Sequence, residues 1–148
     1  LQQIFGNDIT AATKRFYQYT NEMIERGGFD IIGHFDKIHL NGRFIDGFDT
    51  DSTWYQRLIN ETIELIAQKG IIVEINTKSY LEKGITFPDS KTWGLLLKKS
   101  IPIMVNSDCH YPDLITAGFQ PVYQALKDVG FTSTMKRKGN EWKEDPIQ

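Results

Sequence analysis

The stretch IPIMVNSDCH, residues 101–110, places a carboxylate and an imidazole directly after a run of apolar residues. Asp108 and His110 are separated by one residue, so both can turn toward one ion at the end of a strand. A second imidazole, His34, follows a shorter apolar run at residues 31–32. Imidazole nitrogen and carboxylate oxygen suit zinc, iron or manganese, and three protein ligands with open positions are typical of a catalytic metal site. These residues predict a divalent-metal centre.

Simpler interpretations of the same residues remain open at this stage. An Asp-x-His pair also occurs where side chains cap turns, and His34 alone is consistent with a hydrogen-bonded histidine at a strand end. Glu74, inside another apolar run, could be a structural carboxylate. Cys109 should point away from its neighbours in an extended segment, which predicts a small buried packing residue. The metal hypothesis is favoured because polar clusters recur after three separate predicted strands.

The elements that would position these residues alternate between helix and strand. Helical spacing of apolar residues, with Asp8 before the first helix and Gly70 after the second, predicts helices at residues 9–24, 54–66, 89–99 and 121–129. Short apolar runs predict buried strands at residues 31–32, 71–75 and 101–105. Residues 38–51 are predicted to form a loop, and residues 131–145 a hairpin that turns at Gly139.

Strands that alternate with helices predict an α/β fold with a parallel sheet, either open or closed into a barrel. In such folds the ligand lies beyond the carboxyl ends of the strands, where the loops converge. The polar residues fall there: His34 and Asp36 follow the first strand, Asn76 ends the second, and Asp108 and His110 follow the third. The topology therefore predicts that these side chains share one edge of the sheet.

Composition limits the partners and the compartment. The chain has 148 residues, 40% of them hydrophobic, which suits one globular domain with its own core. A net charge of −2 gives no electrostatic reason to bind nucleic acid or an anionic membrane, and no apolar run approaches the roughly 20 residues of a membrane span. The single cysteine cannot form an internal disulfide. We therefore expect a cytoplasmic protein with a small-molecule partner.

Three ordered segments, DIIGHFDKI, VEINT and VNSDCHYPDLITAGFQPVYQALKDVGF, carry a more specific signal. Together they resemble the polymerase-and-histidinol-phosphatase (PHP) superfamily, in particular its histidinol-phosphatase branch, over about residues 6–131. The resemblance implies a distorted (β/α)7 TIM-like barrel with metal ions at the carboxyl ends of its strands. It also implies hydrolysis of a phosphate ester, L-histidinol phosphate, to L-histidinol in histidine biosynthesis.

The same resemblance implies roles for individual residues. His34, Asp108 and His110 match metal ligands, and Asp108 would also act in catalysis by accepting a hydrogen bond from the attacking water. Contacts to the substrate or its phosphate would come from residues on the same loops, namely Asp36, Lys37, His39, Arg43, Asn76 and Lys78. The sequence does not indicate which of the basic residues in this group binds the phosphate.

The sequence departs from the superfamily in one respect. The superfamily adds a His-x-His strand, a bridging Glu and a further His before the first of these motifs, and residues 1–33 contain no histidine. We therefore expect residues 1–148 to be the C-terminal portion of a longer PHP-type domain, inactive alone and able to self-associate through an exposed barrel edge. Alternatives are another PHP phosphoesterase, an amidohydrolase-like metal enzyme, or a non-catalytic structural module. The amidohydrolase is disfavoured because its activating His-x-His and lysine are not visible.

Overall fold

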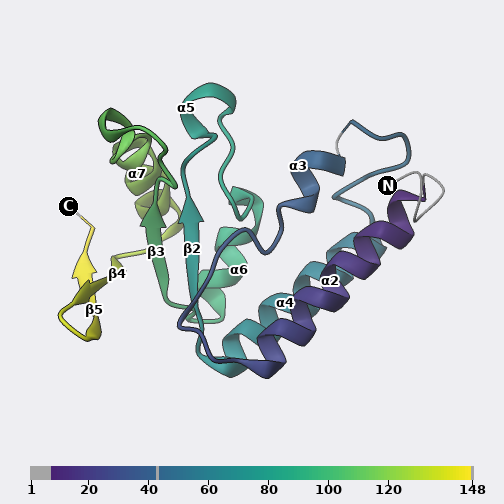
Figure 1. Cartoon of the computed structure of the whole chain (residues 1–148), viewed down its shortest axis with the longest axis horizontal. Coiled ribbons are helices and arrows are strands. Elements are labelled where there is room, and N and C mark those ends of the chain that lie inside the picture. The colour runs from purple at the N-terminus through teal and green to yellow at the C-terminus, as the bar shows by residue number, and fades with distance from the viewer. Residues whose placement is uncertain (1–7, 43, 148) are drawn as a thin grey trace.

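The computed structural model describes residues 8–42 and 44–147 and shows helices packed around a three-stranded parallel sheet (Figure 1). The strands are β1 (Ile31–Ile32), β2 (Ile72–Asn76) and β3 (Ile103–Asn106), in that spatial order. Since all three run in the same direction, their carboxyl ends lie at one edge. The mixed α/β class and the parallel sheet are confirmed. Within the described residues the sheet is open, so a closed barrel stays a prediction.

The two long helices confirm the predicted starts and stops. α2 (Ile9–Arg26) begins at Asp8, whose carboxylate accepts a hydrogen bond from the Ala11 backbone N–H at 2.9 Å. α4 (Thr53–Lys69) ends at Gly70, which adopts the left-handed conformation with φ 65°. The helices lie side by side (Figure 1). The Tyr17 hydroxyl donates to the Tyr55 hydroxyl across this interface at 3.1 Å.

The remaining elements are short. The helices are α3 (Ile38–Gly42), α5 (Tyr80–Lys83), α6 (Trp93–Lys98), which follows the 3₁₀ turn η1 (Ser90–Thr92), and α7 (Phe119–Val129), which follows the 3₁₀ turn η2 (Pro112–Leu114). Strands β4 (Ser133–Lys138) and β5 (Glu141–Pro146) form the predicted antiparallel hairpin. The loop prediction for residues 38–51 was wrong at α3, and α5 was not predicted. Helices of four and five residues are too short to show a helical period.

The sheet presents two chemically different faces. Val73, Ile75 and Ile103 are almost fully buried in the main hydrophobic core. Glu74 alternates with Val73 and Ile75 along β2 and lies beside Met104 in the parallel register, so it projects from the opposite face. Burial of each large apolar side chain contributes about 1.5–3 kcal/mol, which makes the core a firm support for the loops at the carboxyl edge.

Candidate metal centre at the carboxyl edge of the sheet

The structure brings His34, Asp108 and His110 together. His34 lies just beyond β1, whereas Asp108 and His110 lie in the loop after β3. The Asp108 carboxylate lies within reach of both imidazoles: its Oδ2 is 3.9 Å from His34 Nε2, and its Oδ1 is 3.9 Å from His110 Nε2. The predicted shared edge is therefore confirmed for these side chains, and their role as metal ligands stays a prediction.

Two of these residues have an unusual backbone conformation. His34 has φ 55° and Asp108 has φ 46°, in the left-handed region that non-glycine residues rarely adopt. Such conformations cost of order 1–3 kcal/mol each and persist only where the surroundings hold them. The loop after β3 is held by two hydrogen bonds to backbone carbonyls, from Ser107 Oγ to Ile115 at 2.8 Å and from Thr77 Oγ1 to Ala117 at 2.6 Å.

Glu74 orients the His34 ring. Its Oε1 accepts a hydrogen bond from Asn106 Nδ2 at 2.7 Å, its Oε2 accepts one from Asn76 Nδ2 at 3.3 Å, and Oε2 lies 3.5 Å from His34 Nδ1. A carboxylate beside Nδ1 favours the tautomer that carries its proton there, which leaves the Nε2 lone pair free. His34 Nε2 is buried and has no hydrogen-bond partner within the described part of the chain. This nitrogen is available to a ligand that the structure does not contain.

Lys78 joins the centre from the loop after β2. Its Nζ donates to Asp108 Oδ2 at 3.1 Å and to His110 Nε2 at 2.9 Å. Because an ammonium can only donate, His110 Nε2 must act as the acceptor. Partial burial alone would raise the pKa of Asp108, but the hydrogen bond and charge of Lys78, with help from His34 and His110, lower the pKa below its usual value. Asp108 is therefore a carboxylate at neutral pH.

The donor set fits a divalent cation, although its present arrangement is not that of a bound ion. Across residues 8–42 and 44–147, no three His, Cys, Asp or Glu side chains are grouped as a bound metal requires. Instead, the Lys78 ammonium contacts both Asp108 and His110. The Lys78 side chain is 39% exposed and can move away. Without Lys78 the site would offer three donors: His34 Nε2, which has no partner among the described residues, the ionised Asp108 carboxylate, and His110 Nε2, which now accepts from the Lys78 ammonium.

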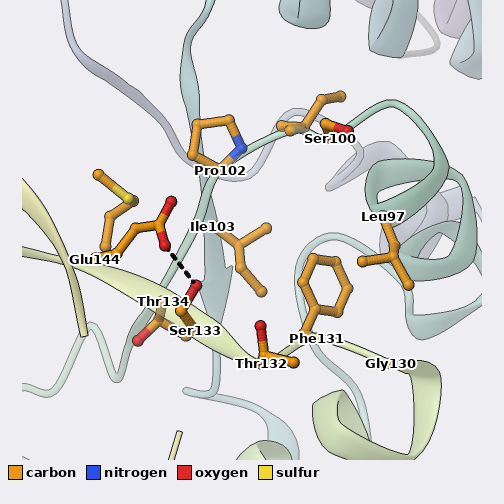
Figure 2. A pocket seen from close by; sticks show the side chains of 12 residues that line it. Leu97, Ser100, Pro102, Ile103, Gly130, Phe131, Thr132, Ser133, Thr134 and Glu144 are labelled. Atoms are coloured by element: carbon orange, nitrogen blue, oxygen red, sulfur yellow. Dashed lines mark hydrogen bonds between the residues drawn. The ribbon is translucent and has the colours of Figure 1, made fainter. Parts of the chain in front are cut away.

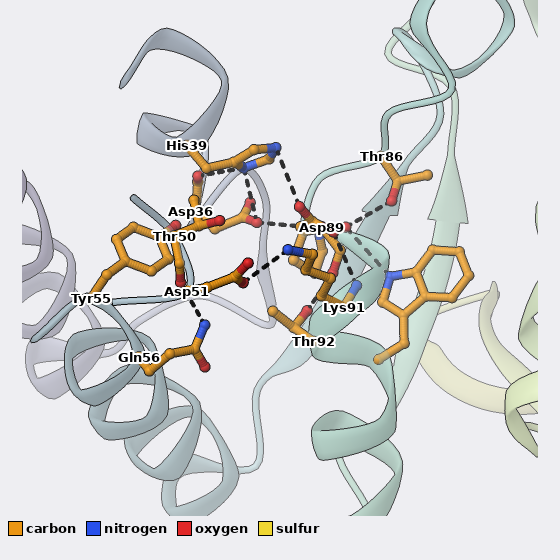
Figure 3. Close-up of polar contacts among 12 residues, drawn as sticks. Asp36, His39, Thr50, Asp51, Tyr55, Gln56, Thr86, Asp89, Lys91 and Thr92 are labelled. Carbon is orange, nitrogen blue, oxygen red and sulfur yellow. Dashed lines mark hydrogen bonds and ion pairs between the residues drawn. The ribbon is translucent and has the colours of Figure 1, made fainter. Parts of the chain in front are cut away.

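A second polar cluster contains Asp36, His39 and Asp89 (Figure 3). Asp36 is fully buried. Its Oδ2 accepts from the Asp89 backbone N–H at 2.6 Å and lies 3.2 Å from His39 Nδ1, while its Oδ1 has no partner among the described residues. The cluster is linked to the candidate metal centre by Phe87, whose ring centroid is 5.6 Å from that of His39 and 5.2 Å from that of His34.

The predicted substrate-binding residues therefore fall in different places. Lys78 lies in the candidate metal centre, and the Asn76 side chain lies beside it but is engaged with Glu74 and with the backbone N–H of Lys78. Lys37 is exposed and its Nζ lies 5.7 Å from the centre of the Phe87 ring. Asp36 and His39 are buried in the second cluster, and Arg43 lies outside the described residues. Substrate contact by these residues stays a prediction.

Phe87 and Asp89 were missed by sequence analysis. They lie between α5 and η1, where no apolar period or motif marks Phe87 and where Asp89 was predicted only as the start of a helix. Their importance is tertiary: Phe87 forms an isolated bridge with Asn76 at the end of β2, and Asp89 is bound through its backbone N–H to Asp36. The only sequence signal nearby is Pro88, which indicates a turn without indicating its contacts.

The prediction for Cys109 was wrong. It is half-buried and lines a surface pocket together with Asp108 and His110, rather than packing in the core. The alternation of an extended strand stops at Asn106, and the left-handed backbone of Asp108 redirects the side chains that follow. Strand periodicity cannot be extended past such a residue.

The second cluster gives a prediction for pH dependence. Burial alone would lower the pKa of His39, but hydrogen bonds and the charge of Asp36, with a contribution from Asp89, raise it above the usual 6.5. A raised pKa in the folded state contributes stability below pH 6.5 that is lost as the pH rises through the folded value. As the pH rises from 6.5 through the folded-state pKa of His39, the urea concentration at the unfolding midpoint should fall more for the wild type than for His39→Gln. If the midpoint changed with pH in the same way in both proteins, the pairing of His39 with Asp36 would be contradicted.

Gly33 gives a test of how Glu74 orients His34. A Cβ at position 33 would lie 2.5 Å from Glu74 Oε2, so Gly33→Ala must displace that carboxylate. Loss of an outer-shell carboxylate typically weakens metal binding by about 10–100-fold, and we expect zinc affinity, measured by calorimetry, to fall within this range. Gly94→Ala is a matched control, because a Cβ there meets no atom within 4 Å among the described residues outside the backbone of its own helix and its chain neighbours. Equal affinity in both variants would show that Glu74 does not prepare His34.

Comparison with known proteins adds no family assignment. No protein-family model matches the chain, and no curated protein matches it at a significant level. The described helices do not include one long and apolar enough to cross a bilayer. The resemblance to the PHP superfamily therefore rests on the three sequence motifs and remains a hypothesis.

Proposed function

We propose that this chain belongs to a metal-dependent phosphomonoesterase that hydrolyses L-histidinol phosphate. The observation that supports metal binding most is the Nε2 of His34, which has no hydrogen-bond partner among the described residues and lies 3.9 Å from the carboxylate of Asp108. Both groups lie at the carboxyl edge of a parallel sheet, the usual position of ligand sites in α/β proteins. The sequence motifs supply the choice of substrate.

Each side chain of the candidate metal centre would have its own role in the reaction. His34, Asp108 and His110 would hold a zinc, manganese or iron ion, which when bound supplies a water of lowered pKa and polarises the phosphoryl group. Glu74 keeps the His34 ring oriented with Nε2 toward Asp108. Asp108, ionised at neutral pH, accepts a hydrogen bond from the attacking water. Lys78, released from Asp108, can bind the phosphoryl oxygens and stabilise the charge that develops on them.

Phosphate release from L-histidinol phosphate tests this proposal. It should be measured with Zn²⁺, Mn²⁺ and Fe²⁺ on residues 1–148 and on an N-terminally extended chain that carries the His-x-His segment. The resemblance predicts release by the extended chain and none by residues 1–148, because ligands from that segment are needed. Release from other phosphomonoesters alone would favour a different phosphoesterase. No release by the extended chain from any ester would overturn the proposal.

A further inference from the structure

The Lys78 ammonium makes contacts that the proposed cation would need. Its Nζ donates to Asp108 Oδ2 at 3.1 Å and to His110 Nε2 at 2.9 Å, and both acceptors belong to predicted metal ligands. A neutral imidazole has a single acceptor nitrogen with one lone pair, so His110 Nε2 cannot accept from Lys78 and bind a metal ion at the same time. Lys78 and a metal ion are therefore alternative partners of this nitrogen.

Exchange of the two partners needs movement of the Lys78 side chain only. The backbone at this position is fixed, because the Lys78 N–H donates to Asn76 Oδ1 at 3.0 Å and the Thr77 N–H donates to the Asn106 carbonyl at 2.8 Å. The side chain is 39% exposed, and a pocket of about 320 Å³ opens beside it. The ammonium can therefore leave His110 by rotation about its own side-chain bonds, without unfolding of the loop.

A divalent cation has two advantages over the ammonium. The contact between Lys78 and Asp108 joins two partly exposed side chains, so water screens it and the ammonium is held weakly. A divalent ion carries twice the charge and can also bind His34 Nε2, which lies 3.9 Å from Asp108 Oδ2 and has no hydrogen-bond partner among the described residues. His34 is thus the ligand that the ion gains and that Lys78 leaves unused.

The cavity drawn in Figure 2 offers no comparable position for such an ion. It has a volume of about 250 Å³ and lies near Ser100 and Pro102, at the amino end of β3. Glu144 is the only ionisable residue among those that line it, and its carboxylate accepts a hydrogen bond from Ser133 Oγ at 3.3 Å. One carboxylate is too few ligands for a zinc ion, so this cavity should not contribute to a metal titration.

We propose that Lys78 acts as an internal cation that competes with the metal ion, so that a divalent cation binds at Asp108 and His110 only when Lys78 is released. This inference rests on the candidate metal centre of the proposed function. It makes Lys78 a regulator of metal occupancy, distinct from the residues that hold the ion. In the metal-free chain the ammonium is the counter-charge of Asp108, and in the metal-bound chain it is released to solvent.

Removal of the competing ammonium should tighten metal binding. We expect Lys78→Met, which keeps most of the side-chain length but has no charge, to bind Zn²⁺ about five- to tenfold more tightly than the wild type in isothermal titration calorimetry. This factor corresponds to a contact that is formed about 80–90% of the time, because apparent affinity falls with the fraction of molecules in which the site is available. Lys14→Met, which removes the same charge from an exposed position on α2, should bind Zn²⁺ like the wild type.

Release of Lys78 can also be followed by its chemical reactivity. Acetylation by N-hydroxysuccinimidyl acetate should be measured by peptide mass spectrometry at Lys78 and Lys14, with and without saturating Zn²⁺. While Asp108 and His110 hold the Lys78 ammonium, its nitrogen is shielded from the reagent. We expect zinc to raise the acetylation rate at Lys78 by about the same five- to tenfold factor and to leave the rate at Lys14 unchanged.

The other outcomes separate this inference from the proposed function. Equal zinc affinity in the wild type and Lys78→Met, or tighter binding by the wild type, would overturn the competition and leave the candidate metal centre intact. An acetylation rate at Lys78 that does not rise with zinc would do the same. No zinc binding by either protein would reject both the competition and the centre. Release of Lys78 by zinc, without phosphate release by the extended chain, would uphold the competition and reject the enzymatic proposal.

Discussion

Replacing Asp108 with asparagine is expected to lower the affinity of the chain for zinc or manganese by more than about 100-fold, since even outer-shell changes cost 10–100-fold. Asp108 is the carboxylate that lies 3.9 Å from both His34 Nε2 and His110 Nε2. Asparagine tolerates the left-handed backbone at this position, φ 46°, and removes only the charge. Isothermal titration calorimetry on the wild type and the variant measures the loss.

A matched control separates this effect from a general loss of negative charge. Asp128→Asn removes the same charge from an exposed position on α7, where the carboxylate accepts a hydrogen bond from Gln124. Its metal affinity should equal that of the wild type. If Asp108→Asn bound the metal as tightly as Asp128→Asn, the ion would have to bind elsewhere and the assignment of Asp108 would be wrong.

Replacing Asp36 with alanine is expected to reduce the free energy of unfolding by about 3–5 kcal/mol, the usual cost of removing one member of a buried charged pair. The Asp36 side chain is fully buried, contacts the His39 ring and accepts a hydrogen bond from the Asp89 backbone N–H at 2.6 Å. Its removal leaves His39 without its main partner and releases the segment that carries Phe87. Urea denaturation, analysed as a two-state transition, gives the loss.

Asp51→Ala is the corresponding control for this stability effect. Asp51 pairs with Lys91 at 2.9 Å (Figure 3). Both side chains are mostly exposed, so the pair is screened by water and contributes little. The unfolding free energy of Asp51→Ala should lie close to that of the wild type. Losses of similar size in the Asp36 and Asp51 variants would show that burial of Asp36 is not what stabilises this region.

The long helices and the strands of the sheet were predicted from patterns within their own segments of the sequence. The long helices α2 and α4 were found from their apolar period and from Asp8 and Gly70 at their ends, and the three strands from short apolar runs. Parallel pairing then followed from the alternation of helix and strand, and with it the common edge for His34 and Asp108. These predictions succeeded because each depends on a pattern contained within one segment or on the order of segments.

The residues that were missed depend on contacts between distant segments. Phe87 is important because its ring lies against those of His34 and His39. Lys78 was predicted as a substrate-binding residue, but its contact with Asp108, thirty positions away in the chain, was not. Cys109 was misplaced because the left-handed backbone of Asp108 breaks the strand alternation that the prediction assumed. No local sequence pattern predicts that an aspartate adopts the left-handed conformation, or that one phenylalanine ring packs against two histidine rings.

The most direct test of the candidate metal centre is a titration of the chain with Zn²⁺ followed by long-range ¹H–¹⁵N NMR of the imidazole rings. The chain contains three histidines, so each ring can be assigned by single substitution. The account predicts that ring nitrogens of His34 and His110 shift on saturation while those of His39, held by Asp36, do not. Shifts confined to His39, or no shift in any ring at millimolar zinc, would contradict it.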